Sequence, residues 1–267
     1  MAKMNMFLHD YTDSSFAIGD TFRNPGFTQG NNLNRFNYVV ANPMWNQDGY
    51  DEEFYNNDAF DRFCYGAPPK SSADWGWVQH MLSSLQRDGR AAIVLDKGAM
   101  SRGSGVKNYN KEREVRKNFV ENDFIEAVIL LPENLFYNTT APGIVMLLNC
   151  DKSAERKGQV LLINASAYFF KGRPKNLLTD QGIAQISQAY LAWQTLEILS
   201  SVVTLQEIRD ADYNLNPAQF VDISSQKEHR LLSEILADLS AATAEREKAD
   251  EDLQNAFANL HLNQKRE

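Results

Sequence analysis

The sequence predicts an α/β fold with a mostly parallel sheet, followed by a helical extension at the carboxyl end. Short apolar runs, several of them rich in Val and Ile, recur through the first two thirds of the chain. Helical patterns or turn residues separate these runs, which is typical of sheets whose strands are joined by helices. From about residue 206 the composition changes, and one long helical pattern takes over.

Six of the apolar runs are predicted strands, and we expect them to be buried because they show little polar alternation. They are residues 16–19 (FAIG), 36–41 (FNYVVA), 90–95 (RAAIVL), 124–131 (FIEAVILL), 143–149 (GIVMLLN) and 159–164 (QVLLIN). Turn residues bound each of them.

Two helices are predicted between these strands. Asp74 is expected to be the N-cap of the first, because apolar residues from Val78 to Leu85 follow it at helical spacing, and Gly89 is a candidate stop. Residues 111–122 form a second, charged helical pattern. Residues 46–73 are polar and irregular, so we expect a long loop there.

Residues 228–260 form a single helical pattern with a heptad seam over about four heptads. The seam consists of Leu232, Ile235, Leu239, Ala242, Arg246, Ala249, Leu253, Ala256 and Leu260. Such a helix can pack on its own domain or pair with another chain, and the sequence leaves both possibilities open. We therefore expect a main domain at 1–205 and a helical, partner-binding tail at 206–267.

Composition excludes several classes of protein. Among 267 residues, 43% are hydrophobic and 11% aromatic, too many for a disordered chain. No apolar run approaches the roughly 18 residues of a membrane span. The two cysteines, Cys64 and Cys150, favour the cytoplasm, and the scattered histidines predict no metal site. The net charge of −8 argues against coating nucleic acid without sequence preference, so any DNA contact must use local positive charge.

The segment Asn42-Pro43-Met44-Trp45 is the strongest candidate for a catalytic site, since it directly follows the predicted strand 36–41. Ligands of open α/β sheets bind at the carboxyl ends of strands. The Asn42 side-chain oxygen and the Pro43 carbonyl could accept both hydrogens of an adenine amine and so aim its lone pair at an electrophilic methyl group. Trp45 could stack on a base flipped out of the duplex. Taken alone, four such residues could equally form a plain β-turn.

The wider sequence resembles the modification subunit of type I restriction–modification systems, a family of DNA adenine methyltransferases. The resemblance extends from residue 4 to about residue 220. It rests on the segments 4–27, 36–50, 71–103, 125–149, 171–176 (KGRPKN) and 211–217 (ADYNLNP), in this order and spacing. It implies a Rossmann-like fold that uses S-adenosylmethionine.

The resemblance also implies roles for individual residues near the amino end. Asp20 matches the acidic position that accepts a hydrogen bond from the adenine amine of S-adenosylmethionine. Thr21 and Phe22 would line the same cofactor pocket, and Asn42 would border it. Without this context, Asp20 could be an ordinary turn residue.

Further roles concern the target base. Asn42 to Trp45 match the family's catalytic Asn-Pro-Pro-aromatic motif, with Met44 in place of the second proline and Trp45 in place of the commoner Phe or Tyr. Phe136 matches a second aromatic position that supports the flipped adenine, and Tyr137 is the neighbouring candidate. The alternative for Phe136 is a core aromatic residue.

The chain also departs from the family, because the Gly-rich cofactor loop and the acidic residue after the second strand lie upstream of the matching region. The resemblance therefore implies an incomplete methyltransferase domain that lacks its first strands. The Gly103-Ser104-Gly105 segment lacks the third glycine of a cofactor loop, so it is better interpreted as part of a substrate-side loop.

Two basic patches are candidate DNA contacts. The first includes Lys97, Arg102 and Lys107, and the second includes Lys171 and Arg173. Lys97 and Arg102 follow the carboxyl end of a predicted strand, which favours phosphate contact. The basic residues within 111–117 fit a solvated helix face equally well.

These features predict transfer of a methyl group from S-adenosylmethionine to the 6-amino group of adenine in DNA, within a type I complex that contains a specificity subunit and a restriction subunit. Two alternatives remain open. One is a non-catalytic fragment that keeps only partner or DNA contacts. The other is a methyltransferase that acts on glutamine in proteins.

Overall fold

The computed structural model describes residues 1–223, 239–240, 242–250 and 253. The chain divides into two units, Met1–Ile223 and Ser224–Glu267. The helix expected at 228–260 falls largely outside the described residues, although residues 242–250 are helical. Its pairing with a partner stays a prediction.

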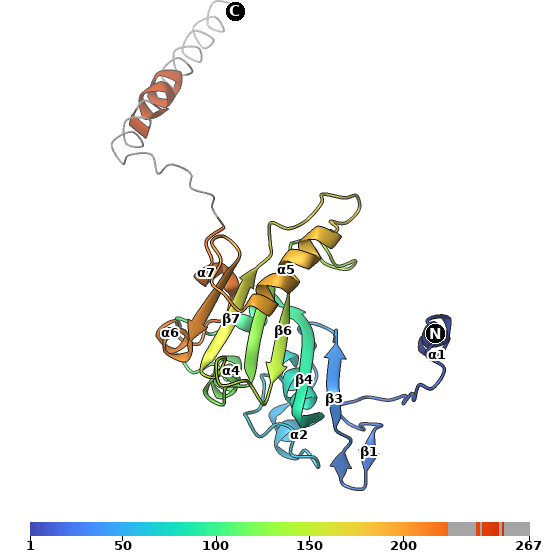
Figure 1. Ribbon diagram of the computed structural model, residues 1–267. Helices are drawn as coiled ribbons and strands as arrows, with labels where there is room; N and C mark the ends of the chain where they lie inside the picture. Colours follow the sequence, from blue (N-terminus) through green and yellow to red (C-terminus); the bar gives the residue numbers. More distant parts are fainter. Residues whose placement is uncertain (224–238, 241, 251–252, 254–267) are drawn as a thin grey trace, which may run out of the picture. The chain divides into compact units, whose positions relative to one another are not determined.

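A six-stranded sheet forms the centre of the first unit, in the order β3-β4-β6-β5-β7-β8 (Figure 1). The strands are β3 (Phe36–Ala41), β4 (Leu85–Asp96), β5 (Ile125–Leu130), β6 (Gly143–Asn149), β7 (Gln159–Asn164) and β8 (Ser200–Thr204). Five of them confirm predicted strands. The sixth, β8, was not predicted, because its serines interrupt the apolar pattern.

The sheet is mixed, so the prediction of a mostly parallel sheet is wrong. Only the β3–β4 and β5–β7 pairs are parallel, whereas the β4–β6, β5–β6 and β7–β8 pairs are antiparallel. The chain returns from β5 to β6 through a loop without a helix, and a short connection requires antiparallel neighbours. Strands buried on both faces have the same apolar composition in either direction, so the sequence alone did not distinguish the two cases.

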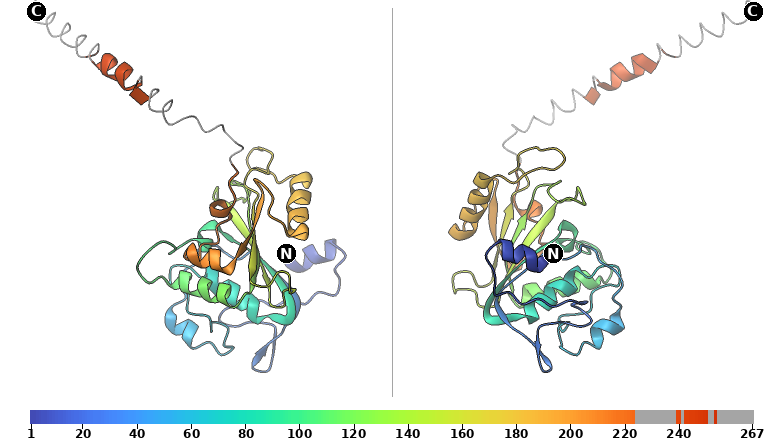
Figure 2. Two further views of the ribbon diagram at one scale, coloured as in Figure 1. Left: turned by 60° about the vertical axis from the view of Figure 1, so that its left-hand side comes forward. Right: turned by 90° about the vertical axis from the view of Figure 1, so that its right-hand side faces the viewer.

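Helices cover the two faces of the sheet unequally (Figure 2). They are α1 (Ala2–Leu8), α2 (Glu52–Asn56), α3 (Asp74–Ser83), η1 (Lys97–Met100), α4 (Lys111–Glu121), α5 (Asp180–Ala192), α6 (Leu205–Asp210) and α7 (Pro217–Phe220). A short hairpin consists of β1 (Thr28–Gln29) and β2 (Asn32–Leu33). Buried residues of α3, α4 and α6 share one core with the sheet, and α5 packs in a separate core over β5, β7 and β8.

The ends of α3 differ from the prediction. Its N-cap is Ala73, and Asp74 is the first helical residue, with a fully buried side chain. The helix ends at Ser83, whereas Gly89 lies inside β4. Asp74 is therefore not a surface cap, and its carboxylate makes the contacts described below.

The edge strand β3 is far more exposed than predicted. Tyr38 is 78% exposed and Val40 is 79% exposed, because no described helix covers this end of the second face. Residues 16–19 form no strand, and Ile18 is fully exposed. Their apolar character indicated burial, but no described strand lies beside them to complete a ladder.

Residues 205–223 pack on the first unit. Ile208 in α6 and Leu215 are fully buried in the core shared with α3 and α4. The sequence placed the boundary after residue 205, where the composition changes. The structure instead keeps α6 and α7 with the sheet, because their few apolar side chains complete its core.

An aromatic cluster beneath the amino-terminal segment is built around Phe22. Its ring stacks on Trp77 at a centroid distance of 3.9 Å and meets Tyr50 edge-on at 4.8 Å. Arg62, which is 1% exposed, anchors this segment because its guanidinium donates hydrogen bonds to the carbonyls of Thr21 and Phe22. It also contacts Nδ1 of His80 at 3.2 Å, and since a guanidinium can only donate, this nitrogen must be unprotonated.

This arrangement predicts that His80 makes stability depend on pH. Burial, together with Arg62, lowers the pKa of His80 from 6.5 to about 4, so the unfolded chain binds the proton more readily than the folded one. The contribution is fully present above pH 6.5 and is lost as the pH falls toward 4. Urea unfolding should show a loss of about 2 to 3 kcal/mol between pH 7 and pH 4.5. His80→Gln, which keeps an acceptor for Arg62, should flatten this dependence; an unchanged slope would contradict the assignment.

Candidate active site

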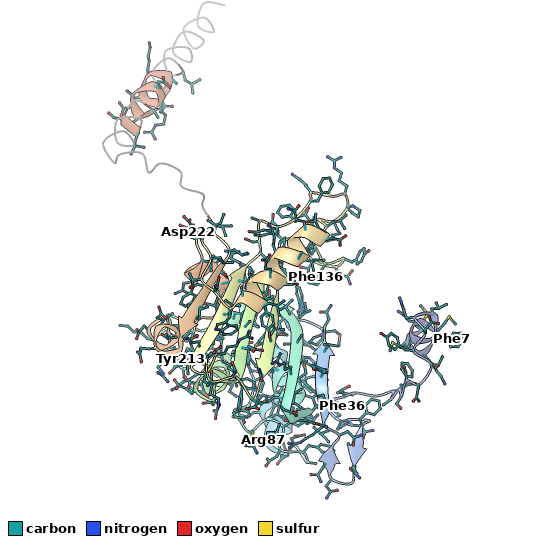
Figure 3. The ribbon with its side chains drawn as sticks, viewed as in Figure 1. Phe7, Phe36, Arg87, Phe136, Tyr213 and Asp222 are labelled. Atoms are coloured by element: carbon teal, nitrogen blue, oxygen red, sulfur yellow. The ribbon has the colours of Figure 1, made fainter. Side chains whose placement is uncertain are left out.

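A pocket lies at the edge of the sheet where β3, β4 and β5 end. Its volume is about 430 Å³, and two loops line it, residues 42–45 after β3 and residues 136–139 after β5. Figure 3 labels Phe136 beyond the carboxyl ends of these strands, whereas Phe36, the first residue of β3, lies at the opposite end. The predicted motif and the predicted second aromatic position, 91 residues apart in the sequence, therefore meet in one pocket.

The two aromatic rings of the pocket contact one another directly. The Trp45 and Phe136 ring centroids are 4.8 Å apart, at an interplanar angle of 73°. This edge-to-face geometry is a favourable one for aromatic pairs. Gly143, the first residue of β6, lies behind them, and a Cβ atom there would come within 2.7 Å of Phe136 and 2.9 Å of Trp45. The absence of a side chain at residue 143 is what allows the rings to approach.

The remaining motif residues line the same pocket. Asn42 is exposed, Pro43 is half-buried and Met44 is 66% exposed. The Asn42 amide and the Pro43 carbonyl thus belong to the loop whose next residues, Met44 and Trp45, form one wall. Met44 adds an apolar, flexible side chain where a second proline would be rigid.

The opposite wall continues past Phe136. Tyr137 also lines the pocket but is 88% exposed, so its ring is available to a ligand without being fixed by packing. Asn138 and Thr139 complete this wall, and sequence reasoning did not single them out.

A second loop holds this wall in place. The Lys175 ammonium donates to the Asn134 side-chain oxygen and to the Thr139 carbonyl, both at 3.0 Å. The Asn176 side chain donates to the Glu133 carbonyl at 2.9 Å. The sequence indicated KGRPKN as part of the family resemblance and as a basic patch, but not that Lys175 and Asn176 would hydrogen-bond to the pocket loop.

Asp20 is linked to the motif loop through Tyr50. The Asp20 carboxylate accepts from the backbone N–H of Phe22 at 2.9 Å and from the Tyr50 hydroxyl at 3.2 Å. Burial, with the nearby Asp20 carboxylate, raises the pKa of Tyr50, which keeps the hydroxyl a donor. The Gln47 side chain in turn donates to the Tyr50 hydroxyl at 3.4 Å. Asp20 is still partly exposed, with 38% of its side chain open to solvent.

The neighbours of Asp20 differ in exposure. Thr21 is exposed, but the Phe22 side chain is fully buried in the aromatic cluster. Phe22 therefore does not line an open cofactor pocket with its ring, contrary to the prediction. The resemblance alone assigned Phe22 to the cofactor pocket. Its ring is buried because the tertiary structure packs Trp77, Phe63 and Tyr50 around it.

Four of the five predicted DNA-contacting residues have side chains open to solvent. Lys107, Lys171 and Arg173 are exposed, and Lys97 is half-buried. Lys97 follows β4, and residues 171–173 lie in the connection after β7, which is parallel to β5. These residues therefore lie on segments that start from the same edge of the sheet as the pocket.

Arg102 is the exception, and its predicted phosphate contact is not supported. Its guanidinium donates to Asp74 at 2.6 Å, to Asp96 at 2.9 Å and to Glu112 at 2.9 Å. Although 29% of the Arg102 side chain is exposed, its guanidinium is already paired with three carboxylates of the protein. The sequence showed a basic residue after a strand but not the carboxylates that the fold places next to it.

Within the described ranges, no group of three His, Cys, Asp or Glu side chains could hold a metal ion. The same residues contain no helix long and apolar enough to cross a membrane.

Comparison with known proteins identifies the family. Residues 1–229 match the model of the N-6 DNA methylase family, so the chain belongs to that family. It is 45% identical over 239 residues to the type I restriction enzyme MjaVII methylase subunit of Methanocaldococcus jannaschii, covering 85% of this chain and 39% of that one. It is 33% identical over 238 residues to the HindI methylase subunit of Haemophilus influenzae, covering 85% and 50%.

Solved structures give the same result for the fold. A type I restriction–modification methyltransferase subunit from Streptococcus thermophilus superposes with a TM-score of 0.72 at 32% identity, over 82% of this chain and 45% of that chain. The M protein of EcoKI superposes with a TM-score of 0.61 at 17% identity, over 94% and 57%, and supports the fold alone. The predicted methyltransferase fold is thus confirmed. The chain spans between two fifths and one half of the length of these two curated relatives.

The close approach at Gly143 gives a prediction about packing. Gly143→Ala should destabilise the protein by about 1 to 3 kcal/mol, because the added methyl group overpacks the site against Phe136 and Trp45. In a Phe136→Leu background the same substitution should cost less, since the nearest ring is gone. Chemical unfolding of the four proteins of this double-mutant cycle measures the coupling, and additive effects would contradict the proposed contact.

Proposed function

We propose that this chain forms the catalytic part of a DNA adenine methyltransferase, which transfers methyl from S-adenosylmethionine to the 6-amino group of adenine. The observation that carries the proposal is the pocket of about 430 Å³ that Asn42–Trp45 and residues 136–139 line together. Family membership and the likeness to type I methylase subunits support it.

The pocket suits a planar base that has left the duplex. Trp45 and Phe136 contact one another, so the two rings would have to separate for an adenine to stack on Trp45 with Phe136 and Tyr137 along its other side. Base–aromatic stacking contributes on the order of 1–3 kcal/mol, which offsets part of the cost of unstacking. The walls are apolar at Trp45 and Phe136 and polar at Asn42, so they fit an aromatic ring with one hydrogen-bonding edge.

Asn42 and Pro43 would activate the amine by accepting its hydrogens. The Asn42 side-chain oxygen and the Pro43 carbonyl would each take one N–H, which localises the lone pair on nitrogen and directs it at the methyl carbon. The methyl group would be supplied from the donor's carbon–sulfur bond, and the sulfur would leave as a neutral thioether. The nitrogen must afterwards lose one proton, and because amide oxygens are very weak bases this proton passes to water.

S-adenosylmethionine supplies the electrophilic methyl group when bound. The residues present fit part of it: the Asp20 carboxylate is partly exposed and held by the Phe22 N–H and Tyr50, so it could accept from an adenine amine. Thr21 is exposed beside Asp20, whereas the buried Phe22 ring would anchor this turn to the core. In the resemblance the Gly-rich cofactor loop lies outside the matching region, so we propose that these residues provide only one side of the cofactor site.

We further propose DNA, a specificity subunit and a restriction subunit as partners. Lys97, Lys107, Lys171 and Arg173 would contact phosphates near the pocket, and the part of the predicted tail 206–267 that follows Ile223 would contribute to binding the specificity subunit. Both cysteines are free and exposed, which fits a reducing cytoplasm.

The alternative is a non-catalytic fragment, and one observation favours it: the chain spans only 39% to 50% of these curated relatives. Calorimetric titration of the chain with S-adenosylmethionine separates the two. Binding in the micromolar range would contradict the alternative. Absence of both binding and methylation, even in the presence of a specificity subunit, would contradict our proposal.

Asn42→Ala should abolish methylation of duplex DNA by the chain reconstituted with a specificity subunit, because one of the two acceptors of the amine is lost. We expect a fall in kcat of at least about a hundredfold, as for the loss of a group aimed at the reacting centre. Transfer of a labelled methyl group from S-adenosylmethionine measures it.

The matched control is Asn138→Ala, which removes an amide from the other wall of the same pocket. It should change kcat by less than about tenfold, because the proposed mechanism assigns it no hydrogen bond to the amine. Equal losses of kcat in the two variants would contradict the proposed role of Asn42.

Lys171→Ala and Arg173→Ala should each weaken DNA binding and reduce the slope of log K against log salt by about one. The control is Lys157→Ala, which removes an exposed lysine from the turn before β7, at the opposite edge of the sheet. It should leave the slope unchanged. Fluorescence anisotropy of labelled duplex between 50 and 200 mM salt gives the slopes, and three equal slopes would refute the placement of DNA.

A further inference from the structure

The residue that follows the catalytic motif is held by a buried carboxylate. Asn46 adopts a left-handed backbone conformation, with φ of +51°, and turns the chain away from the pocket directly after Trp45. Its backbone N–H donates to Oδ1 of Asp74 at 2.8 Å. Asp74 is fully buried at the start of α3, whereas Asn46 is exposed, so the bond ties an exposed loop to the buried end of the helix.

Arg102 joins this carboxylate to a second one that also contacts Asn46. One terminal nitrogen of the guanidinium donates to Oδ2 of Asp74 at 2.6 Å, and the other donates to Oδ2 of Asp96 at 2.9 Å. The Asn46 side chain lies 3.4 Å from the same Asp96 oxygen. Asn46 is therefore held at its backbone by α3 and at its side chain by the end of β4, and one guanidinium bridges the two anchors.

The remaining contacts fix Arg102 itself. Glu112 at the start of α4 is buried and accepts from the guanidinium on its far side. Burial raises the pKa of Asp74, and the bonds from Asn46 and Arg102 oppose that shift. Since α3, α4 and the end of β4 all contribute, the position of Asn46 depends on the packed core and not on the loop's own residues.

We propose that Asp74 and Arg102 are positioning residues for the catalytic loop. They fix Asn46 and thereby hold the Pro43 carbonyl and the Trp45 ring at the pocket, without touching substrate themselves. The proposal rests on the function proposed above and deepens it, because it assigns to Arg102 a role in catalysis in place of a contact with DNA. A Lys at residue 102 could not serve, since it lacks the two-armed geometry that bridges Asp74 and Asp96.

Asp123 provides a matched control, because it makes the same two kinds of contact away from the pocket. Its carboxylate pairs with the buried Lys152 ammonium at 2.6 Å and accepts from the Gly158 backbone N–H at 2.9 Å. It precedes β5, at the opposite edge of the sheet from the motif. Asp123→Ala thus removes a comparable pair of bonds from the same fold.

The experiment compares Asp74→Ala, Asp74→Asn, Arg102→Lys and Asp123→Ala by hydrogen exchange and by steady-state methylation. In Asp74→Ala and Arg102→Lys, amides of residues 44–49 should exchange at least about tenfold faster. The kcat should fall about a hundredfold, with the KM for DNA within about threefold of the original, as expected for a misplaced reacting group. Asp74→Asn keeps an acceptor for the Asn46 N–H and should recover part of both losses.

Two results would overturn the proposal. The first is exchange of residues 44–49 in the Asp74 and Arg102 variants no faster than in Asp123→Ala. The second is a loss of kcat in Asp123→Ala equal to theirs, which would indicate a general effect on folding. If the unmodified protein does not methylate DNA at all, the proposed function fails, whereas the exchange rates still decide whether Asp74 and Arg102 hold the loop. If Asp74→Ala does not fold, Asp74→Asn and Arg102→Lys carry the same comparison.

Discussion

The antiparallel pairing of β6 between β4 and β5 is the constraint on which the site depends. It pairs Gly143 with Asp96, so the beginning of β6 lies beside the end of β4. The same strand pairs Ile144 with Leu130, which brings the loop after β5 to that edge as well. With β3 parallel to β4, the loops that carry Trp45 and Phe136 are directed into one pocket, and the glycine at the start of β6 leaves room for their rings.

Charged side chains of both signs lie around this edge of the sheet. The net charge is −8, yet four exposed or half-exposed basic residues lie on segments around the pocket edge or on the loop beyond it. Three carboxylates pair with Arg102, one of the five basic residues predicted to contact DNA. Arg102 is thus bonded within the protein, whereas the other four basic residues stay open to solvent, as the proposed contact with a polyanion requires.

The sequence predicted much of the fold and part of the site, and the failures have physical causes. Runs such as 125–130 and 159–164 are so apolar that the sequence pattern alone predicts them as buried strands. Strand direction, however, follows from the length and path of connections, so the mixed order was missed. Tyr38 is exposed because no described helix covers it, and residues 16–19 form no strand because no described strand pairs with them. The apolar composition of a segment does not predict which elements will lie beside it.

The sequence by itself determined the chemistry available to this protein: the Asn42–Trp45 motif, the matching aromatic at Phe136 and the family to which they point. Only the tertiary structure decided which residues use that chemistry. Phe22 became core and Arg102 became a bridge between carboxylates, because Trp77 and Asp74, each distant in sequence, came to lie against them. Local patterns specify what a side chain can do, whereas burial and partners, which are properties of the packed chain, determine what it does.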